Sequence, residues 1–324
     1  MRKITAVLLL SALLLTGCSS KPHTVRDLIL NTEVFITVYR RADLKAAEKA
    51  MELCREYELI FSRTDPDSEL SRLNRREISK VTTPLAEVIQ LGLKYSQLSG
   101  GAFDITMGAV TDLWDFTSTT PSPPSPEDLK AAIPSVGWET ISVSGNNIEF
   151  ENPGTRIDLG AIAKGYIADR MADELRTEGV SSAIISLGGN LCFVGSKPDG
   201  SDYQAGIQYP HEARNVTIGG LPIQDGSVVT SGLYERCFQQ GDTLYHHILN
   251  PKTGYPIQNE LVAVSIVGPS SVDCDALSTV CFALGLDSGM TLLEGLENTE
   301  GIFITSDLQI FLTSGLESQF YTVE

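Results

Sequence analysis

Basic residues, histidines and long apolar runs are scarce in this sequence. Only 24 Lys and Arg stand against 41 Asp and Glu in 324 residues, a formal net charge of −17, and no run of basic residues occurs. A chain with this charge repels phosphate backbones, so nucleic acid is not expected as a partner. Hydrophobic residues make up 42% and charged residues 20%, which is typical of a folded globular protein and not of a disordered or fibrous one.

Several nucleotide and metal motifs are also missing. The chain has neither a GxGxxG nor a Walker A segment, so neither a Rossmann nor a P-loop architecture is supported. It has six Cys and four His but no CxxC pair and no Cys/His cluster, which argues against a zinc site. Five cysteines follow residue 18, and an odd number in so long a chain is not a disulfide framework, so we expect these cysteines to fill the core.

The N-terminus has the pattern of an export signal. Two basic residues precede an apolar run over residues 4–15, which is too short to span a bilayer and fits the central region of a signal peptide. The run ends in LTGC (15–18), the pattern of a bacterial lipoprotein signal. A plain secretory signal whose small residues happen to precede a cysteine is the alternative.

This pattern predicts how the protein is located. We expect a signal peptide over residues 1–17, a lipid on Cys18 and a tether over residues 18–27. The protein would then be exported and anchored to a bacterial membrane, on its periplasmic or outer cell-surface side. Because the chain is acidic, it would be held to an anionic membrane by the lipid alone.

The rest of the chain mixes helical and strand-like patterns without a regular βαβ repeat. Apolar residues at helical spacing predict helices over residues 43–61, from residue 83 onward, over 162–178 and over 273–284. Runs of β-branched and aromatic residues predict strands over 34–39 and 183–187. This mixture indicates an α+β fold with mixed, largely antiparallel sheets and packed helices.

Residues 117–126 form the low-complexity stretch of the chain. It is rich in Ser, Thr and Pro and ends in a predicted capping box of Ser125 and Asp128. Because segments rich in polar and glycine residues lie on both sides of it, we interpret it as a surface insertion. Residues 28–324 are therefore expected to form a single domain.

The first segment that suggests chemistry is SGGAFDIT (99–106). Its two glycines let the backbone approach a ligand closely, and Asp104 lies between apolar residues, where an unpaired carboxylate is costly. A turn in which Asp104 acts as a capping residue explains the same pattern equally well.

The second segment, RIDLGAIAKGY (156–166), leads into a predicted helix. A helix N-terminus offers free N–H groups and a positive dipole end, which suit a phosphate. Asp158 suits a ribose hydroxyl, and Lys164 adds a positive charge in the first turn. The alternative is an ordinary Asp N-cap followed by a solvated Lys.

The densest polar region combines TSG (230–232), YHHILNPKTG (245–254) and DCDALST (273–279). Asp275 and Thr279 are four residues apart on a predicted helix, so they share a face, and their oxygens together with backbone carbonyls suit Mg²⁺. His246 and His247 would face opposite sides of a strand, so at most one of them points into a cleft. Taken alone, the Asp–Thr pair is more often a capping device and a strand His more often structural.

Together these segments resemble the ApbE-like flavin transferases (the thiamine biosynthesis lipoprotein ApbE family), whose members transfer FMN from FAD onto proteins. The resemblance runs from about residue 28 to about residue 286. Each motif is short, but seven in the same order are specific. The motifs are DSELSRLN (67–74), GAFDIT (101–106), IDLGAIAKG (157–165), SLGGN (186–190), TSG (230–232), HILNPKTG (247–254) and DALST (275–279).

The resemblance implies an ApbE-like fold, FAD as the substrate, Mg²⁺ as the cofactor and a set of site residues. The FAD contacts it implies are Ala102, Phe103, Asp104, Asp158 and Lys164. The Mg²⁺ ligands it implies are the backbone carbonyl of Ala161 and the side chains of Asp275 and Thr279. His247 matches the histidine implicated in transfer, where it would act as a general base.

Two residues depart from the pattern of the family. Thr64 stands where relatives often have an aromatic residue, so no ring is available there to stack on the flavin. Asn250 stands where Asp is usual, which removes a charge near the histidine strand.

The activity that the resemblance implies is Mg²⁺-dependent transfer of FMN from FAD to a Thr or Ser hydroxyl, with release of AMP. The acceptor would be an exported or membrane redox protein with a Ser/Thr-Gly-Ala-Thr-type segment. Two alternatives remain: hydrolysis of FAD to FMN and AMP, and non-catalytic binding or storage of FAD. The presence of Asp275, Thr279 and His247 weighs against pure storage, which requires neither a metal site nor a base.

Overall fold

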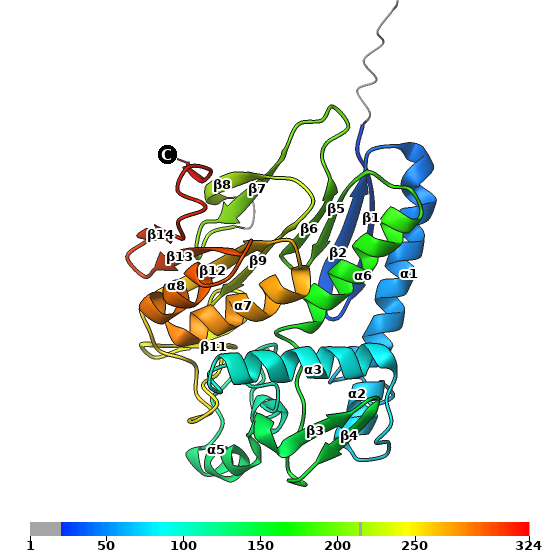
Figure 1. The fold of residues 1–324 in the computed structure, drawn as a ribbon. Helices are drawn as coiled ribbons and strands as arrows, with labels where there is room; N and C mark the ends of the chain where they lie inside the picture. The colour runs from blue at the N-terminus through cyan, green and yellow to red at the C-terminus, as the bar shows by residue number, and fades with distance from the viewer. Residues whose placement is uncertain (1–20, 214–215, 324) are drawn as a thin grey trace, which may run out of the picture.

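The computed structural model describes residues 21–213 and 216–323 (Figure 1). The expected signal peptide and the lipidation site at Cys18 lie outside these residues. Within the two described ranges, no helix is long and apolar enough to cross a membrane.

An eight-stranded antiparallel sheet forms the centre of the fold. Its strands are, in spatial order, β1 (His23–Ile29), β2 (Thr32–Val38), β5 (Ser182–Leu187), β6 (Asn190–Gly195), β9 (Ser227–Gly232), β12 (Leu261–Gly268), β13 (Glu300–Thr305) and β14 (Ile310–Leu312). Strand β12 is buried continuously from Leu261 to Ile266 because both faces of the sheet are covered at that point.

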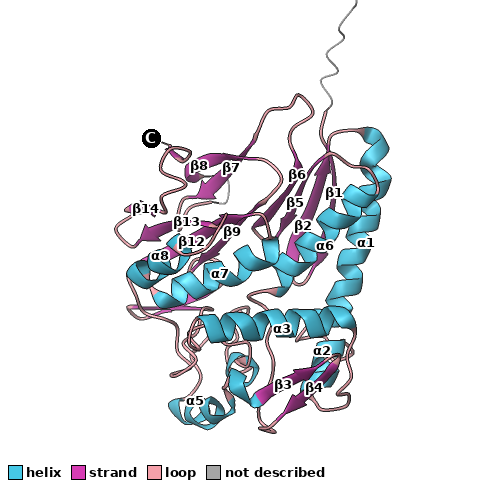
Figure 2. Cartoon of the chain, in the orientation of Figure 1, coloured by secondary structure: helices cyan, strands magenta, loops and turns pink. Residues whose placement is uncertain are grey.

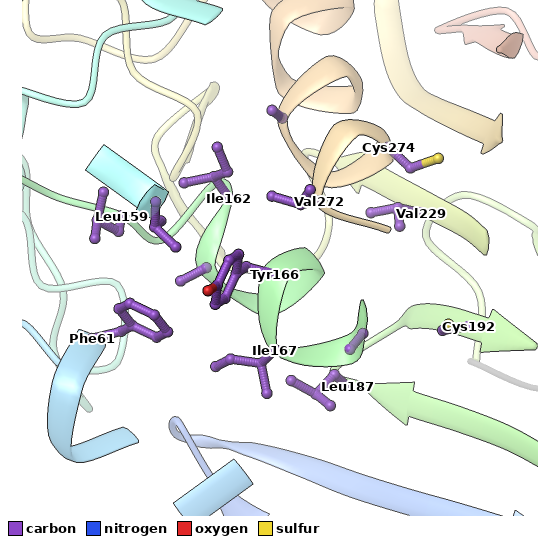
Figure 3. Packing of buried hydrophobic residues seen from close by; sticks show 14 of the residues in the cluster. Phe61, Leu159, Ile162, Tyr166, Ile167, Leu187, Cys192, Val229, Val272 and Cys274 are labelled. Carbon is purple, nitrogen blue, oxygen red and sulfur yellow. The ribbon is translucent and has the colours of Figure 1, made fainter. Parts of the chain in front are cut away.

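Helices cover one face of this sheet (Figure 2). They are α1 (Leu44–Phe61), α6 (Ala163–Thr177), α7 (Ser271–Leu284) and α8 (Leu286–Glu294). Helix α6 packs on β5 and β6, and α7 packs on β9 and β12 and along α6. Figure 3 shows Phe61, Tyr166, Ile167 and Leu187 meeting in the interior between α1, α6 and the sheet. The first turn of α6 and the first turns of α7 are thereby brought next to each other.

A smaller antiparallel sheet packs on the other face. It contains β7 (Tyr203–Gln208), β8 (Thr217–Ile223) and β15 (Tyr321–Thr322). Tyr203 of this sheet lies in one buried cluster with Phe193 of β6 and Ile302 of β13. On β9, Val228 belongs to this cluster and Val229 to the cluster under the helices, as expected for successive residues of a strand.

The remaining elements lie beyond the ends of α6 and α7, in the lower part of Figure 1. They are α2 (Glu69–Asn74), α3 (Thr83–Leu98), α4 (Gly108–Thr111), α5 (Pro126–Ala132), the hairpin β3 (Ile141–Ser144) and β4 (Asn147–Phe150), and the hairpin β10 (Cys237–Gln240) and β11 (Thr243–His246). Short 3₁₀ turns occur at Arg41–Asp43, Ile133–Ser135 and Trp138–Thr140. Several of these elements carry segments that the sequence singled out.

The predicted helices, the two predicted strands and the predicted fold class are confirmed. Every ladder between named strands in the described residues is antiparallel, and helices pack on the sheets, so the fold is α+β with largely antiparallel sheets. The capping box is present, since Ser125 accepts a hydrogen bond from the Asp128 N–H at 3.1 Å. Four free cysteines are buried, namely Cys54, Cys192, Cys274 and Cys281, and Cys237 is half-buried.

The tether expected over residues 18–27 is wrong for residues 23–27. These residues form most of β1, which pairs with β2 from His23–Val38 to Ile29–Thr32. Exposure alternates along β1, so one row of its side chains covers the edge of the core while the other faces solvent. A short polar segment can therefore form a strand at the edge of the sheet. The proposal that 28–324 is a single domain remains a prediction.

Candidate functional site

The crossing of α6 over α7 positions the carboxylate of Asp275. The backbone N–H of Gly165 donates to Asp275 Oδ2 at 2.8 Å, although the two residues are 110 positions apart in the sequence. A Cβ on residue 165 would lie 2.3 Å from the Ser271 carbonyl oxygen and 2.7 Å from Asp275 Cβ. Only glycine therefore allows the helices to approach closely enough for this hydrogen bond.

Lys164 lies on the other side of the same carboxylate. Its Nζ is 3.6 Å from Asp275 Oδ1 and donates to the carbonyl of Gly160 at 3.0 Å. The side chain of Asp275 is 5% exposed and that of Lys164 is 28% exposed, so the two charges meet where water screens them little. Lys164 is therefore engaged in an ion pair and a hydrogen bond and is not an ordinary solvated residue.

Thr279 belongs to a small group of hydroxyls. Its Oγ1 lies 3.1 Å from Ser231 Oγ on β9, and Ser231 Oγ lies 2.7 Å from Ser278 Oγ. Ser278 in turn donates to the Asp275 carbonyl at 2.8 Å. The role of Ser231, which lies in the TSG motif, could not be predicted from sequence because its contact with Thr279 depends on how β9 packs against α7.

Asp275 and Thr279 supply oxygen atoms of the kind that Mg²⁺ takes as ligands. The N–H of Gly165 is directed to Asp275 and not to the carbonyl of Ala161 one turn earlier, and no hydrogen bond to that carbonyl occurs in the described chain. A carboxylate, a hydroxyl and a backbone carbonyl are the hard oxygen ligands that Mg²⁺ prefers. Among the described residues, no group of three His, Cys, Asp or Glu side chains is placed to hold a metal, so any metal here would rely on this mixed set.

The two neighbouring histidines differ in their surroundings, as the sequence predicts. His246 ends β11 and is buried, with its Nε2 3.0 Å from the Ile257 carbonyl oxygen. His247 follows the strand; its N–H donates to the Arg236 carbonyl at 3.1 Å, and its buried Nδ1 has no hydrogen-bond partner. His247 is therefore the histidine with an uncommitted ring nitrogen.

The electrostatic environment keeps His247 neutral. Burial, the charges of Arg236 and His246, and the charge of Lys164 together lower the pKa of His247 to about 3. A neutral imidazole with a free nitrogen can accept a proton, which is what a general base requires.

An aromatic cluster holds the histidine hairpin in place. Trp114 stacks on Phe116 with ring centroids 5.3 Å apart, and Phe238 of β10 stacks on Tyr245 of β11 at 5.2 Å. Trp114 also donates its indole N–H to the Gly254 carbonyl at 2.9 Å. Trp114 therefore packs against this hairpin and forms a hydrogen bond with the last residue of the HILNPKTG motif (247–254).

Asn250 shapes the turn of that motif. Its Oδ1 accepts from the Lys252 N–H at 2.8 Å, and its carbonyl accepts from the Gly254 N–H at 2.8 Å. An amide oxygen and a carboxylate oxygen accept this bond equally well, so the turn does not require the Asp that is usual in relatives. Thr64, the other departure, is exposed, and its hydroxyl lies 3.4 Å from Ser62 Oγ.

Asp104 has the contacts of a capping residue. Its Oδ1 accepts from the N–H and hydroxyl of Thr106 at 2.8 and 2.6 Å, and its Oδ2 accepts from the Trp138 N–H at 3.2 Å. Burial raises the pKa of Asp104 against these hydrogen bonds, which lower it. The ring of Phe103 is 5% exposed and Ala102 is half-buried, so this segment could meet a ligand mainly through its backbone and Ala102.

Asp158 lies next to this loop and is tied to it. Its N–H donates to the Ile105 carbonyl at 2.7 Å, and its Oδ1 accepts from the Gly160 N–H at 2.9 Å. It does not cap α6, whose N-cap is Ile162. Its second oxygen lies 3.2 Å from Arg63 Nε, a partner that sequence reasoning did not find.

The structure therefore links the sequence-predicted residues in two groups. Asp275, Thr279 and Lys164 are linked around the ends of α6 and α7, and Asp104 and Asp158 are linked through the loop in front of α6; the hydrogen bond of His247 goes instead to Arg236. The segment from Asp158 to Lys164 joins the groups. A surface hollow between α3, α6 and α7 is lined by Glu87, Lys94, Tyr166, Asp169 and Arg170 and includes none of the predicted residues.

Comparison with known proteins identifies the family of this chain. The model of the ApbE family matches residues 30–303. A Klebsiella pneumoniae protein named FAD:protein FMN transferase is 32% identical over 306 residues, which cover 93% of this chain and 95% of that protein. A Treponema pallidum protein of the same name is 31% identical over 318 residues, which cover 91% of this chain and 88% of that protein.

Solved structures show the same fold. The crystal structure of the ApbE protein of Thermotoga maritima has a TM-score of 0.84 at 27% identity and covers 94% of this chain and 100% of that one. The flavin transferase ApbE of Vibrio cholerae has a TM-score of 0.79 at 25% identity and covers 92% of this chain and 99% of that one.

Fold, site and relatives together define an α+β enzyme of the transferase class. The chain belongs to the ApbE family, as its motifs predict.

Proposed function

We propose that this protein transfers FMN from FAD to a Thr or Ser hydroxyl of an exported or membrane redox protein and releases AMP. The observation that carries the proposal is the arrangement at the α6–α7 crossing. Asp275 is held between the Gly165 N–H and Lys164, Thr279 lies one turn further along α7, and His247 has a buried Nδ1 without a hydrogen-bond partner. Relatives that are named FAD:protein FMN transferase support the choice of substrate.

Mg²⁺ would be held by Asp275, Thr279 and the Ala161 carbonyl. When bound, it supplies positive charge that neutralises a diphosphate and stabilises a departing phosphate. This requirement follows from the charge of the protein: a chain of net charge −17 has no general attraction for an anionic diphosphate, so binding must come from local groups.

Lys164 and the start of α6 would bind the phosphates of FAD. The ammonium of Lys164 is a compact positive charge that can bind a phosphate. The N–H groups of Ala163 and Gly165 are already engaged by the Leu159 carbonyl and Asp275, so the charge of Lys164 would carry most of this interaction. Ala102, Phe103, Asp104 and Asp158 would contact the remainder of FAD, with the backbone of the 99–106 loop supplying hydrogen-bonding groups.

His247 would act as the general base. The acceptor hydroxyl oxygen forms a bond to the phosphorus of the FMN half, and the bond from that phosphorus to the bridging oxygen breaks, so AMP leaves with the electron pair. The hydroxyl proton passes to the ring of His247, whose Nδ1 has no hydrogen-bond partner. The ring is unprotonated at neutral pH because its pKa is lowered to about 3.

The partners of the reaction follow from this proposal. The acceptor would present a Ser/Thr-Gly-Ala-Thr-type segment in an exposed loop, so that its hydroxyl can approach His247. A lipid on Cys18 would place the enzyme on the periplasmic or outer cell-surface side of a bacterial membrane, where exported redox proteins are found.

One experiment separates this function from its alternatives. The lipid-free protein is incubated with FAD, Mg²⁺ and a flavin-acceptor domain that contains the segment, and mass spectrometry measures FMN on the acceptor and free AMP. Transfer predicts both products in equal amounts. AMP without labelled acceptor would indicate hydrolysis, and FAD that binds tightly but stays intact would indicate storage; either result would overturn the proposal.

A further inference from the structure

Arg63 connects three segments that are distant in the sequence. Its Nε lies 3.2 Å from Asp158 Oδ2, in front of α6, and its NH1 donates to Asp112, at the end of α4. Arg63 itself follows α1. Asp112 is also held from outside by Arg156, whose NH1 lies 2.9 Å from Asp112 Oδ2. The result is a row of alternating charges that runs from Arg156 at the surface to Asp158 at the site.

The inner part of this row is the more protected. The side chains of Arg63 and Asp158 are 24% and 19% exposed, whereas those of Asp112 and Arg156 are 36% and 55% exposed. Ion pairs that are exposed to water are weak, and pairs that are partly withdrawn from it are stronger. The contact between Arg63 and Asp158 should therefore be the one that matters energetically.

Both oxygens of Asp158 are engaged: Oδ2 faces Arg63, and Oδ1 leads to the proposed phosphate-binding groups. Asp158 Oδ1 accepts from the Gly160 N–H at 2.9 Å, and the carbonyl of Gly160 accepts from Lys164 Nζ at 3.0 Å. Lys164 then lies 3.6 Å from Asp275 Oδ1. A change in the orientation of the Asp158 carboxylate would thus shift Gly160 and, with it, the ammonium of Lys164.

We propose that Arg63 is a positioning residue for FAD binding that acts through Asp158. This inference rests on the proposed function. Arg63 fixes the carboxylate so that one oxygen orders the Gly160 turn, and its positive charge offsets a negative charge that would otherwise oppose the FAD diphosphate. A guanidinium suits this task because its planar donors hold two carboxylates at once, which an ammonium does less well.

The test measures FAD affinity from the quenching of flavin fluorescence, and KM and kcat from FMN transfer to the acceptor domain. Arg63→Ala is expected to weaken FAD binding about tenfold while kcat at saturating FAD stays within twofold, and Arg63→Lys should recover part of the loss. Arg156→Ala is the matched control: it removes an arginine from the same row without touching Asp158, and FAD affinity should stay within twofold.

A double-mutant cycle decides whether Arg63 acts through Asp158. In an Asp158→Asn background, Arg63→Ala should change FAD affinity less than twofold. An equal loss in both backgrounds would overturn the inference, as would unchanged affinity in Arg63→Ala or in Asp158→Asn alone. Circular dichroism checks that each variant is folded; a variant that lowers kcat and thermal stability together with affinity would show a merely structural role.

The failure of this inference is distinguishable from failure of the proposed function. If the unmodified protein does not label the acceptor with FMN, the proposed function fails. If it labels the acceptor and Arg63→Ala binds FAD normally, only the positioning role fails.

Discussion

Replacing Gly165 with alanine should separate α6 from α7 and disturb the candidate site. The added Cβ would lie 2.3 Å from the Ser271 carbonyl oxygen and 2.7 Å from Asp275 Cβ, and real Cβ atoms do not come within 3.0 Å of other heavy atoms. The obstacle at the shorter contact is backbone, which cannot rotate away. The helices must therefore move apart by roughly 1 Å, which forfeits part of their dispersion contact.

The size of the effect can be estimated from three contributions. Overpacking a core costs about 1–3 kcal/mol, and losing the hydrogen bond from the Gly165 N–H to a carboxylate costs about 1.5–3 kcal/mol. Alanine returns about 1 kcal/mol through its higher helix propensity. We expect the free energy of unfolding to fall by roughly 2–5 kcal/mol and the melting temperature by roughly 4–10 °C for a chain of this size.

Urea unfolding followed by tryptophan fluorescence measures the loss, with Gly295→Ala as the matched control. Gly295 has a φ of −88°, and a Cβ there would lie 3.4 Å from the Leu292 carbonyl oxygen, an ordinary contact. The control should therefore stay within about 0.5 kcal/mol of the unmodified protein. Equal unfolding midpoints for the two variants would refute the close approach of α6 and α7, and unchanged Mg²⁺-dependent transfer in Gly165→Ala would refute its link to Asp275.

Three further predictions concern the metal, the histidine and the cysteines. Asp275→Asn should lower the rate of Mg²⁺-dependent transfer by roughly a hundredfold, which is about 2.7 kcal/mol in activation free energy. The control Asp287→Asn, at an exposed residue, should leave the rate unchanged. Full activity of Asp275→Asn would contradict the metal assignment. Burial and neighbouring positive charges lower the pKa of His247 from 6.5 to about 3, so the unfolded chain binds a proton at this residue more readily than the folded chain does. The contribution of His247 to stability is therefore present above pH 6.5 and is lost as the pH falls toward 3. Urea midpoints of His247→Gln should fall less over this range than those of the unmodified protein, and parallel curves would contradict the pKa shift. In the native lipid-free protein, a thiol reagent should label Cys237 well before Cys54, whose pKa burial raises to about 12, and equal rates by mass spectrometry would contradict the packing.

Much of the fold was predictable because it depends on local patterns. The helix over residues 43–61 corresponds to α1 (Leu44–Phe61), since the spacing of its apolar residues matches a helix that buries one face. The capping box at Ser125 was predictable for the same reason, because its donor and acceptor are three residues apart. Strand β1 was missed because a short edge strand is recognisable only once its partner, β2, is known.

The sequence proposes a set of site residues but not the contacts that these residues make. Asp275 and Thr279 share a helix face by spacing alone, so their pairing follows from sequence. The contact of Thr279 with Ser231 and that of Asp158 with Arg63 each join segments that only the fold brings together. Asp104 was expected either to cap a turn or to meet a ligand; its bonds to Thr106 and Trp138 are those of a cap, and its contact with FAD stays a prediction.

The sequence by itself determined the acidic charge, the element types, the oxygen-rich composition of the site and membership of the ApbE family. These properties depend on residue identity and on short spacings. The tertiary structure decided which groups form hydrogen bonds and ion pairs with one another and how far their pKa values shift. Gly165 meets Asp275 across 110 residues, and His247 loses its affinity for a proton only where burial and the charges of other segments act on it. Desolvation and Coulomb interactions depend on distance in space, which the order of residues along a chain does not specify.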